Sequence, residues 1–190
     1  MRIVAGRHRG RKIAAPDSME IRPTSDRVRE SVFNILKHGD LGKGGVSPLT
    51  GARVLDAFCG TGAFGLEALS RGAEHSTFLD ISNTALDICR ENIIALNEQT
   101  RTDLLRTDCL KSVCHAEPYD LVFIDPPYSA NLAQPAIVNL MRSGWISDEA
   151  VCVIETGPDE ALNIADAFTL LEDRKYGKTR IRISRYVKAN

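Results

Sequence analysis

Four residues in a row, Asp125-Pro126-Pro127-Tyr128, directly follow the apolar run Leu121–Ile124. Proline has no backbone N–H to donate and holds its φ angle at about −65°. We therefore expect a stiff turn at a strand end, where free carbonyl groups lie beside one acid and one aromatic ring. Acceptors beside a ring suit a flat ligand with an exocyclic amine, such as a nucleobase. The alternative is an ordinary strand-to-loop turn with a locally satisfied aspartate.

A glycine-rich segment follows another apolar run earlier in the chain. Gly60, Gly62 and Gly65 fit the pattern G-x-G-x-x-G. Because glycine has no side chain, the backbone can approach a ligand closely, and a following helix presents free N–H groups. The pattern fits both dinucleotide enzymes and enzymes whose cofactor has no phosphate. Asp56 favours the second class, since a carboxylate near the loop would repel pyrophosphate but could help to hold an ammonium group.

Acidic residues follow four successive predicted strands. Asp56 and Asp80 end the first two, and Asp108 and Asp125 come just past the next two. Ligands of such sheets bind at the carboxyl ends of the strands, so we expect these acids to gather there. Asp80 is placed to accept from both ribose hydroxyls and Asp108 from an adenine N6 amine. This pattern predicts a site for S-adenosylmethionine, although NAD enzymes also use an acid at the second strand.

The elements that would position these residues alternate along the chain. Apolar runs and their boundaries predict strands at 53–57, 76–79, 103–106, 119–124, 151–154, 167–172 and 179–187. Helices are predicted at 62–71, 82–96 and 133–142. Repeated strand–helix units imply a parallel sheet with helices on both faces, and the last two strands imply one antiparallel member. We therefore predict an α/β fold with a seven-stranded, mostly parallel sheet.

The chain before this pattern has a different character. Residues 2–14 predict a short β-hairpin with a basic turn, and a helix is expected from Thr24 or Ser25 to about Lys37. A glycine-rich loop follows between residues 39 and 51. We therefore divide the chain into an N-terminal basic extension, residues 1–40, and a main body, residues 41–190.

Basic residues concentrate in two segments, although the formal net charge is only −1. Residues 1–30 carry a net charge of +4 and residues 174–190 of +7, whereas residues 31–173 carry −12. In residues 180–185, arginines alternate with β-type residues, which would place them on one side of a strand. We therefore expect a cationic surface that binds a polyanion.

Other features bound the class of protein. The five cysteines are scattered without a C-x-x-C pattern, and the four histidines form no ligand-spaced group with them. This favours reduced thiols, a cytoplasmic protein and no metal site. The longest apolar runs are far shorter than the ~20 residues that span a bilayer, and the basic start lacks the apolar region of a secretory signal. We also expect a monomer.

Together these motifs resemble the class I S-adenosylmethionine-dependent methyltransferases, and the D-P-P-Y turn resembles the signature of enzymes that methylate exocyclic amines of nucleobases. More closely, nearly the whole chain resembles the RsmD family, bacterial methyltransferases that act on a guanine N2 in 16S ribosomal RNA. The resemblance is carried by residues 2–6, 9–12, 22–30, 33–36, 55–62, 125–128 and 176–179.

The resemblance implies a Rossmann-like methyltransferase fold and S-adenosylmethionine as the methyl donor. It implies a catalytic turn made of Asp125, Pro126, Pro127 and Tyr128. The expected cofactor-binding residues are Asp56, Phe58, Gly60, Thr61, Gly62, Asp80, Ile81, Asp108 and Cys109.

The resemblance also implies ribosomal RNA as the partner, in an assembling small subunit that is recognised largely by its shape. Basic side chains would bind its phosphates, and the expected residues are Arg7, Arg9, Arg11, Lys12, Arg22 and Lys178.

Three other functions remain open from the residues alone. A nicotinamide-dependent oxidoreductase would use the same glycine loop but would leave the D-P-P-Y turn unexplained. A non-catalytic RNA-binding assembly factor could retain the fold. An adenine-N6 or cytosine-N4 methylase is also compatible, because the turn suits any exocyclic amine and only the resemblance points to guanine.

Overall fold

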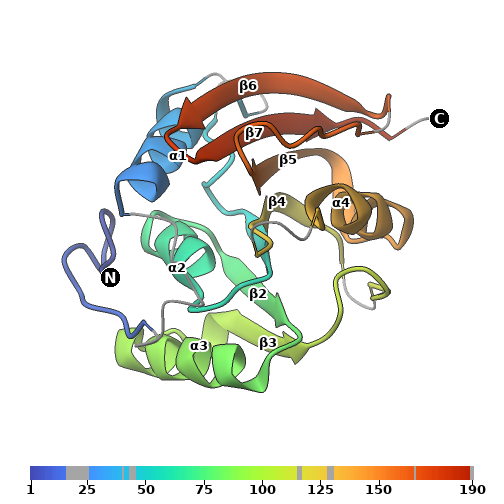
Figure 1. Ribbon diagram of the computed structural model, residues 1–190. Coiled ribbons are helices and arrows are strands. Elements are labelled where there is room, and N and C mark those ends of the chain that lie inside the picture. Colours follow the sequence, from blue (N-terminus) through green and yellow to red (C-terminus); the bar gives the residue numbers. More distant parts are fainter. Residues whose placement is uncertain are drawn as a thin grey trace.

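Seven strands form a single sheet in the computed structural model, which describes residues 1–15, 26–39, 41–42, 46–114, 117–127, 131–164 and 166–188 (Figure 1). The strand order is β3-β2-β1-β4-β5-β7-β6. The bounds are β1 (Arg53–Ala57), β2 (His75–Asp80), β3 (Thr102–Arg106), β4 (Tyr119–Ile124), β5 (Ile146–Thr156), β6 (Phe168–Tyr176) and β7 (Thr179–Tyr186).

One strand runs against the others. The neighbouring pairs from β3 to β5 are all parallel, whereas β7 is antiparallel to both β5 and β6. The predicted sheet, mostly parallel with one antiparallel strand, is confirmed. The order places β1 beside β4, so the chain segments that follow these two strands emerge next to each other at one edge of the sheet.

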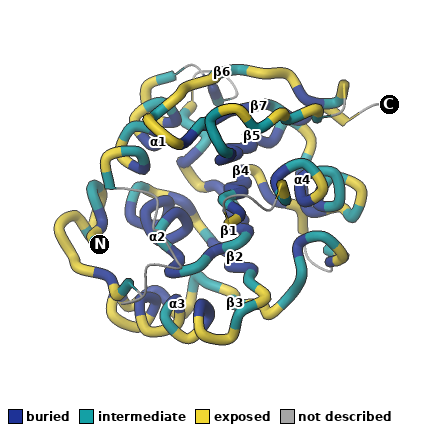
Figure 2. Tube along the Cα trace, in the orientation of Figure 1, coloured by how far each residue is buried: buried dark blue, intermediate teal, exposed yellow. Residues whose placement is uncertain are grey.

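Helices cover both faces, as predicted. The first face carries α1 (Asp26–His38), α2 (Ala63–Ser70) and α3 (Asn83–Leu96), and the other carries α4 (Ala133–Arg142) (Figure 1). A short 3-10 helix, Gln99–Arg101, follows α3. Figure 2 shows the buried residues concentrated along the central strands. These strands are buried on both faces, which explains their continuous apolar runs.

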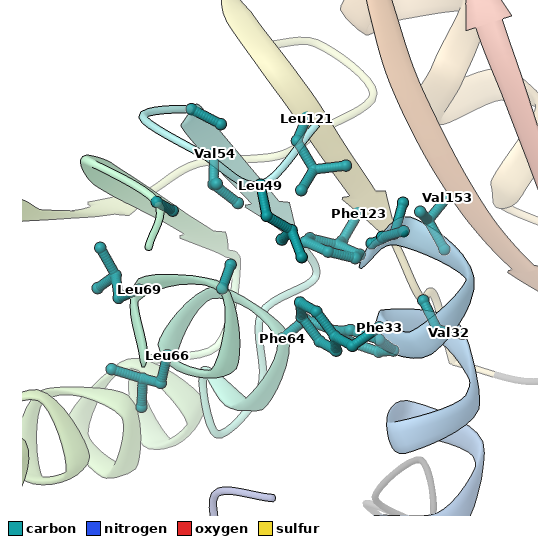
Figure 3. Close-up of a cluster of buried hydrophobic side chains, with 14 of the residues drawn as sticks. Val32, Phe33, Leu49, Val54, Phe64, Leu66, Leu69, Leu121, Phe123 and Val153 are labelled. Carbon is teal, nitrogen blue, oxygen red and sulfur yellow. The ribbon is translucent and has the colours of Figure 1, made fainter. Parts of the chain in front are cut away.

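Three phenylalanines join α1 and α2 to the sheet. The ring centroid of Phe64 in α2 lies 4.8 Å from that of Phe123 in β4 and 6.1 Å from that of Phe33 in α1 (Figure 3). Phe33 and Phe123 are also in contact, with centroids 5.5 Å apart. This cluster lies two residues before Asp125 on β4, so the strand end that carries the acid is backed by a packed core.

Two strands extend beyond their predicted bounds. β5 begins at Ile146 rather than at Val151, and β6 ends at Tyr176 rather than at residue 172. The added residues are mostly polar and carry no apolar pattern. The added residues of β6 pair with β7 as far as Tyr176 and Thr179. In β5, Ile146 pairs with Tyr119 of β4, and the register then shifts before Val151.

Residues 1–15, called here the N-terminal arm, form a minimal version of the predicted β-hairpin. The arm folds back on itself through glycine turns, and its two halves are joined by an antiparallel bridge between Arg2 and Lys12 and by further backbone hydrogen bonds, such as that from the Ile3 N–H to the Arg11 carbonyl at 2.9 Å. Side chains of α2 and α3 also bind the backbone of the arm. Ile3 and Ile13 are buried in the same core as α1 and the sheet. The proposed functional division at residue 40 remains a prediction.

Candidate active site

The ends of β1, β2 and β4 bring the predicted acids to one edge of the sheet. Ala57 of β1 is in register with Leu79 of β2 on one side and with Ile124 of β4 on the other. Asp80 and Asp125 therefore each lie one position beyond the level of Ala57. The glycine loop, residues 58–62, leaves β1 between them, so the two predicted half-sites are adjacent.

The glycine loop has an unusual backbone. Phe58, Gly60 and Gly62 have φ angles of 59°, 52° and 77°, a region that side chains disfavour. A Cβ placed on Gly60 would have no atom within 4 Å, whereas one on Gly62 would lie 2.6 Å from Cys89 Sγ of α3. Gly60 thus keeps the space over the loop open, and Gly62 permits close packing beneath it.

Asp56 lies under the glycine loop, at the end of β1, and contacts the start of α2. It is only 2% exposed, and its Oδ2 accepts a hydrogen bond from the Gly65 N–H at 2.8 Å, in the first turn of α2. Burial raises the pKa of Asp56 to about 7, against the lowering effect of the Gly65 bond, and the nearby Asp80 raises it further. The observed contact fixes the start of α2. Any action of Asp56 on an ammonium group remains a prediction.

Asp80 lies at the mouth of the same loop and is half-buried. Its Oδ2 accepts from the Gly60 N–H at 3.0 Å and its Oδ1 from the Ser82 N–H at 2.8 Å. The carboxylate therefore joins the glycine loop to the start of α3. The adjacent Ile81 is 62% exposed, like several other large apolar side chains of the described residues, and its role at a ligand site remains a prediction.

The remaining predicted cofactor-binding residues are either partly exposed, as Asp108 and Phe58 are, or buried, as Thr61 and Cys109 are. Asp108, with a side chain 31% exposed, accepts from the Leu110 N–H at 2.9 Å and lies 3.8 Å from Lys111 Nζ. Thr61 and Cys109 are 6% and 3% exposed, and burial raises the pKa of the Cys109 thiol to about 12. Phe58 is half-buried and packs against the core under α4. Thr61 and Cys109 therefore shape the loops chiefly from within.

The predicted catalytic turn, residues 125–128, begins where β4 ends. Asp125 is half-buried, Pro126 is buried and Pro127 is exposed, while Tyr128 lies outside the described residues. Asp125 borders a gap too narrow for a water molecule, together with Phe64, Phe123, Ile124, Val153, Glu155 and Ile181.

Glu155 is a polar neighbour of this turn that the sequence reasoning missed. It follows Ile154, which is in register with Ile124, so the two acids lie at the ends of adjacent parallel strands. Glu155 is 3% exposed and accepts from Thr179 Oγ1 at 3.3 Å. The available signal was an acid directly after the fifth predicted strand.

Comparisons with known proteins agree with this geometry. The family model described as conserved hypothetical protein 95 matches residues 1–185. A ribosomal RNA small subunit methyltransferase D from Haemophilus influenzae is 35% identical, over 93% of this chain and 89% of the relative. The protein of the same name from Escherichia coli K12 is 32% identical, over 96% and 88%. This chain belongs to the RsmD family of methyltransferases.

Solved structures agree with the assignment to the RsmD family. A putative methyltransferase from Escherichia coli superposes with a TM-score of 0.83 at 30% identity, over 98% of both chains. A magnesium protoporphyrin IX methyltransferase from Synechocystis, solved with its methyl donor bound, has a TM-score of 0.63 at 17% identity and shares the fold. The predicted Rossmann-like methyltransferase fold is confirmed.

The basic residues expected to bind RNA in this family member have different surroundings. Arg7 pairs with the buried Glu98, and Arg11 donates to the Ala95 carbonyl, although both arginines remain exposed. Arg9 and Lys12 are exposed, and neither forms an ion pair with another described residue. Lys178 is exposed in the turn between β6 and β7, and Arg22 lies outside the described residues.

The described part of the chain offers neither a membrane span nor a metal cluster. No helix in it is long and apolar enough to cross a membrane. Within the same residues, no group of three or more His, Cys, Asp or Glu side chains is arranged to hold a metal ion.

A cavity of about 270 Å³ lies at the opposite, amino end of the strands and includes Asp120 and Ser147 in its lining. It is separate from the predicted chemistry.

Proposed function

We propose that this protein transfers a methyl group from S-adenosylmethionine to the exocyclic N2 amine of a guanine in small-subunit ribosomal RNA. The observation that carries the proposal is the adjacency of two motifs, because the glycine loop after β1 lies beside the Asp125-Pro126-Pro127 turn after β4. One motif suits a methyl donor and the other an amine acceptor.

The residues around the glycine loop fit the donor. The open space over Gly60 admits a ligand close to the backbone, and Asp80 offers a carboxylate to ribose hydroxyls at the edge of that space. Ile81 offers an exposed apolar side chain and Asp108 an acceptor for an adenine amine. S-adenosylmethionine would supply a methyl group that its sulfonium already activates.

The catalytic turn would orient the amine. The lone pair of an exocyclic purine amine is conjugated with the ring, so the nitrogen is a poor nucleophile. The Asp125 carboxylate and the Pro126 carbonyl would accept its two hydrogens, which favours a pyramidal nitrogen and stabilises the positive charge that develops on it. Tyr128 would stack on the extruded base, a contact worth ~1–3 kcal/mol for an aromatic side chain.

The choice of polymer rests on the relatives and on the charges. Relatives with about a third of their residues identical are named small-subunit ribosomal RNA methyltransferases. The exposed Arg9, Lys12 and Lys178 provide cations for phosphates. We infer that a structured RNA, in an assembling subunit, is recognised mainly by its shape, and that the enzyme acts as a monomer without a metal.

Mapping of methylated nucleosides by mass spectrometry tests the substrate. Ribosomal RNA from a strain that lacks this protein should lose one N2-methylguanosine, and the wild-type protein should restore it. Loss of N6-methyladenosine or N4-methylcytosine would instead support the rival methylases. An unchanged nucleoside profile would contradict the proposal.

A variant of the turn tests the mechanism. Asp125→Ala should lower kcat by ~100-fold or more, the loss typical when a donor or acceptor that stabilises developing charge is removed. Its affinity for S-adenosylmethionine, measured by calorimetry, should stay unchanged. Asp87→Ala is the matched control, because Asp87 lies on α3 with a side chain 67% exposed. Full turnover by Asp125→Ala would show that Asp125 does not act on the amine.

A further inference from the structure

One buried side chain joins the N-terminal arm to the glycine loop. Asn92 of α3 is only 1% exposed. Its Nδ2 donates to the Thr61 carbonyl at 2.9 Å and to the Ala14 carbonyl at 3.1 Å, and its Oδ1 accepts from the Ala14 N–H at 2.6 Å. Both N–H groups of the amide are used, and one side chain holds the end of the arm and the middle of the loop.

The other end of the arm reaches the same loop residue. Thr61 Oγ1 donates to Met1 Sδ at 3.7 Å. Between these two ends, the N–H groups of Val4 and Ala5 donate to Glu67 of α2 at 2.7 and 3.0 Å. Figure 1 shows the arm running alongside α2 and α3, the two helices that flank the loop. The arm and the loop therefore form one contiguous network.

Helix formation does not explain why an asparagine stands at this position. Asparagine is a weaker helix former than alanine or leucine, and its short polar side chain competes with the helix backbone. An apolar residue of similar size would leave the carbonyl of the buried Thr61 without this partner, which is costly, and would release the backbone of Ala14. The amide fits because it offers two donors and an acceptor to backbone groups that come from distant segments.

The loop is a sensitive place for such a contact. Phe58 and Gly60, on its way to Thr61, already hold positive φ angles, so the loop depends on surrounding contacts for its shape. Asp80 and Asp56 hold it on the side of the sheet, through Gly60 and the start of α2. Asn92 and Met1 hold it on the side of the arm.

We propose that Asn92 is a positioning residue that couples RNA binding at the N-terminal arm to cofactor binding at the glycine loop. The identities of the two ligands rest on the proposed function, but the coupling between arm and loop does not. Phosphate contacts through Arg9 and Lys12 restrict the motion of the arm. Because Asn92 bonds both Ala14 and Thr61, the motion of Thr61 is then restricted too. By thermodynamic linkage, a cofactor on the loop orders Ala14 to the same degree.

Hydrogen exchange of the full chain tests the coupling without RNA. The probe is S-adenosylhomocysteine, the donor after loss of its methyl group. In the wild-type protein, saturating probe should slow exchange in peptides from residues 1–15 by about 5-fold or more. In Asn92→Ala the probe should still bind, but the arm should exchange at the same rate with and without it. An equal slowing in both proteins would overturn the proposal.

Binding of RNA tests the reciprocal effect. The RNA is 16S ribosomal RNA purified from a strain that lacks the protein. Saturating S-adenosylhomocysteine should tighten its binding to the wild-type protein by about 5-fold or more, and to Asn92→Ala by a factor near 1. The same tightening in both proteins would contradict the role of Asn92. Arm protection without any RNA methylation would contradict the proposed function and leave the coupling intact.

Two further variants separate coupling from general loosening. Ser70→Ala is the matched control, since Ser70 Oγ donates to the Ala5 carbonyl at 2.6 Å and accepts from the His8 N–H at 3.0 Å without reaching the loop. It should keep the response of the arm to the probe, and loss of that response would contradict the proposal. Asn92→Asp keeps the size and one acceptor but removes both donors. It should lose the response as Asn92→Ala does, and it serves as the test if Asn92→Ala does not fold.

Discussion

The N-terminal arm and the strand pair β6–β7 are both rich in arginine and lysine, but the fold uses their charges differently. In the arm, the backbone is anchored by the buried Glu67, and side chains such as Arg9 and Lys12 remain exposed. In β7, the side chains themselves are the anchors. Arg182 is 8% exposed and donates to Thr156 Oγ1 at 3.0 Å and to the Glu160 carbonyl at 2.9 Å.

The other two arginines of β7 are also engaged. Arg180 binds both carboxylate oxygens of Asp173 on β6, at 2.7 and 2.6 Å. Arg185 donates to the Leu41 carbonyl at 3.0 Å and lies 3.8 Å from Glu149. The alternation in residues 180–185 therefore builds internal contacts, and the expectation that it forms an exposed cationic face is wrong for Arg182. The sequence determines how many basic residues a segment contains. The contacts with neighbouring segments determine how many of these side chains remain available to bind a ligand.

The anchoring of the arm predicts the largest effect. Glu67→Ala removes the acceptor of the Val4 and Ala5 N–H groups and leaves the buried Arg29 without the carboxylate that lies 3.9 Å away. Loss of one partner from a buried ionic network should lower the free energy of unfolding by ~3–5 kcal/mol, measured by urea denaturation. Glu74→Ala, at an exposed position between α2 and β2, is the matched control and should change little. A loss below ~1 kcal/mol for Glu67→Ala would show that the arm is not anchored by this acid.

A smaller loss of stability is expected in β7. Arg182→Ala leaves the Glu160 carbonyl and the Thr156 hydroxyl without their charged donor, so the free energy of unfolding should fall by ~2 kcal/mol. For a domain of this size the melting temperature should drop by about 4–8 °C. Arg182→Lys should restore only part of the loss, because lysine cannot reproduce the two-pronged contact. Below the transition, RNA affinity and its salt dependence should equal those of the wild type. A weaker salt dependence would show that Arg182 contacts phosphate.

The exposed cations of the arm should affect RNA binding and not stability. The double variant Arg9→Ala/Lys12→Ala should reduce the slope of log affinity against log salt by about 1–2, if each side chain neutralises one phosphate. Its free energy of unfolding should stay within ~0.5 kcal/mol of the wild type. The matched control is Arg174→Ala/Lys175→Ala on β6, which removes the same charge from exposed positions. An equal or larger decrease of the salt slope in that control would show that β6 contributes at least as much as the arm to phosphate binding.

Much of the fold could be predicted because each central strand or helix has a clear apolar run or a clear helical period in the sequence. β1, β4 and α4 have their predicted bounds, since an apolar run or a helical period marks each of them. The placement of Asp80 and Asp125 at the carboxyl ends of their strands followed from the same pattern. The polar extensions of β5 and β6 could not be predicted, because their pairing depends on neighbouring strands and not on their own composition.

The contacts of the arm were beyond sequence reasoning for a different reason. Glu67 is an acidic residue within the largely apolar helix α2 and Asn92 a polar residue within α3, and neither helix pattern names a partner for them. Their partners, Val4 and Ala14, lie 63 and 78 residues away in the chain. Only the fold brings these groups together, so the support of the glycine loop by the arm could not be inferred from spacing.

The smallest expected effect is that of Arg180→Ala, and its pH dependence separates it from Arg182→Ala. Hydrogen bonds from Arg180 hold the pKa of Asp173 below its usual value, with help from the nearby charges of Arg182 and Lys175. A carboxyl group with a lowered pKa in the folded state stabilises the fold above its ordinary pKa of 3.8, and this contribution disappears as the pH falls further.

The difference in unfolding free energy between the wild type and Arg180→Ala should therefore be small at pH 7 and shrink as the pH falls below 3.8, as followed by urea denaturation at each pH. The difference for Arg182→Ala should persist over the same range, because its main partners, a hydroxyl and a carbonyl, do not titrate. If the two variants lost their effects in parallel as the pH falls, Arg182 would depend on the Asp173 carboxylate rather than on its buried neutral partners. The contrast between an exposed ion pair and a buried anchor within one strand would then be wrong.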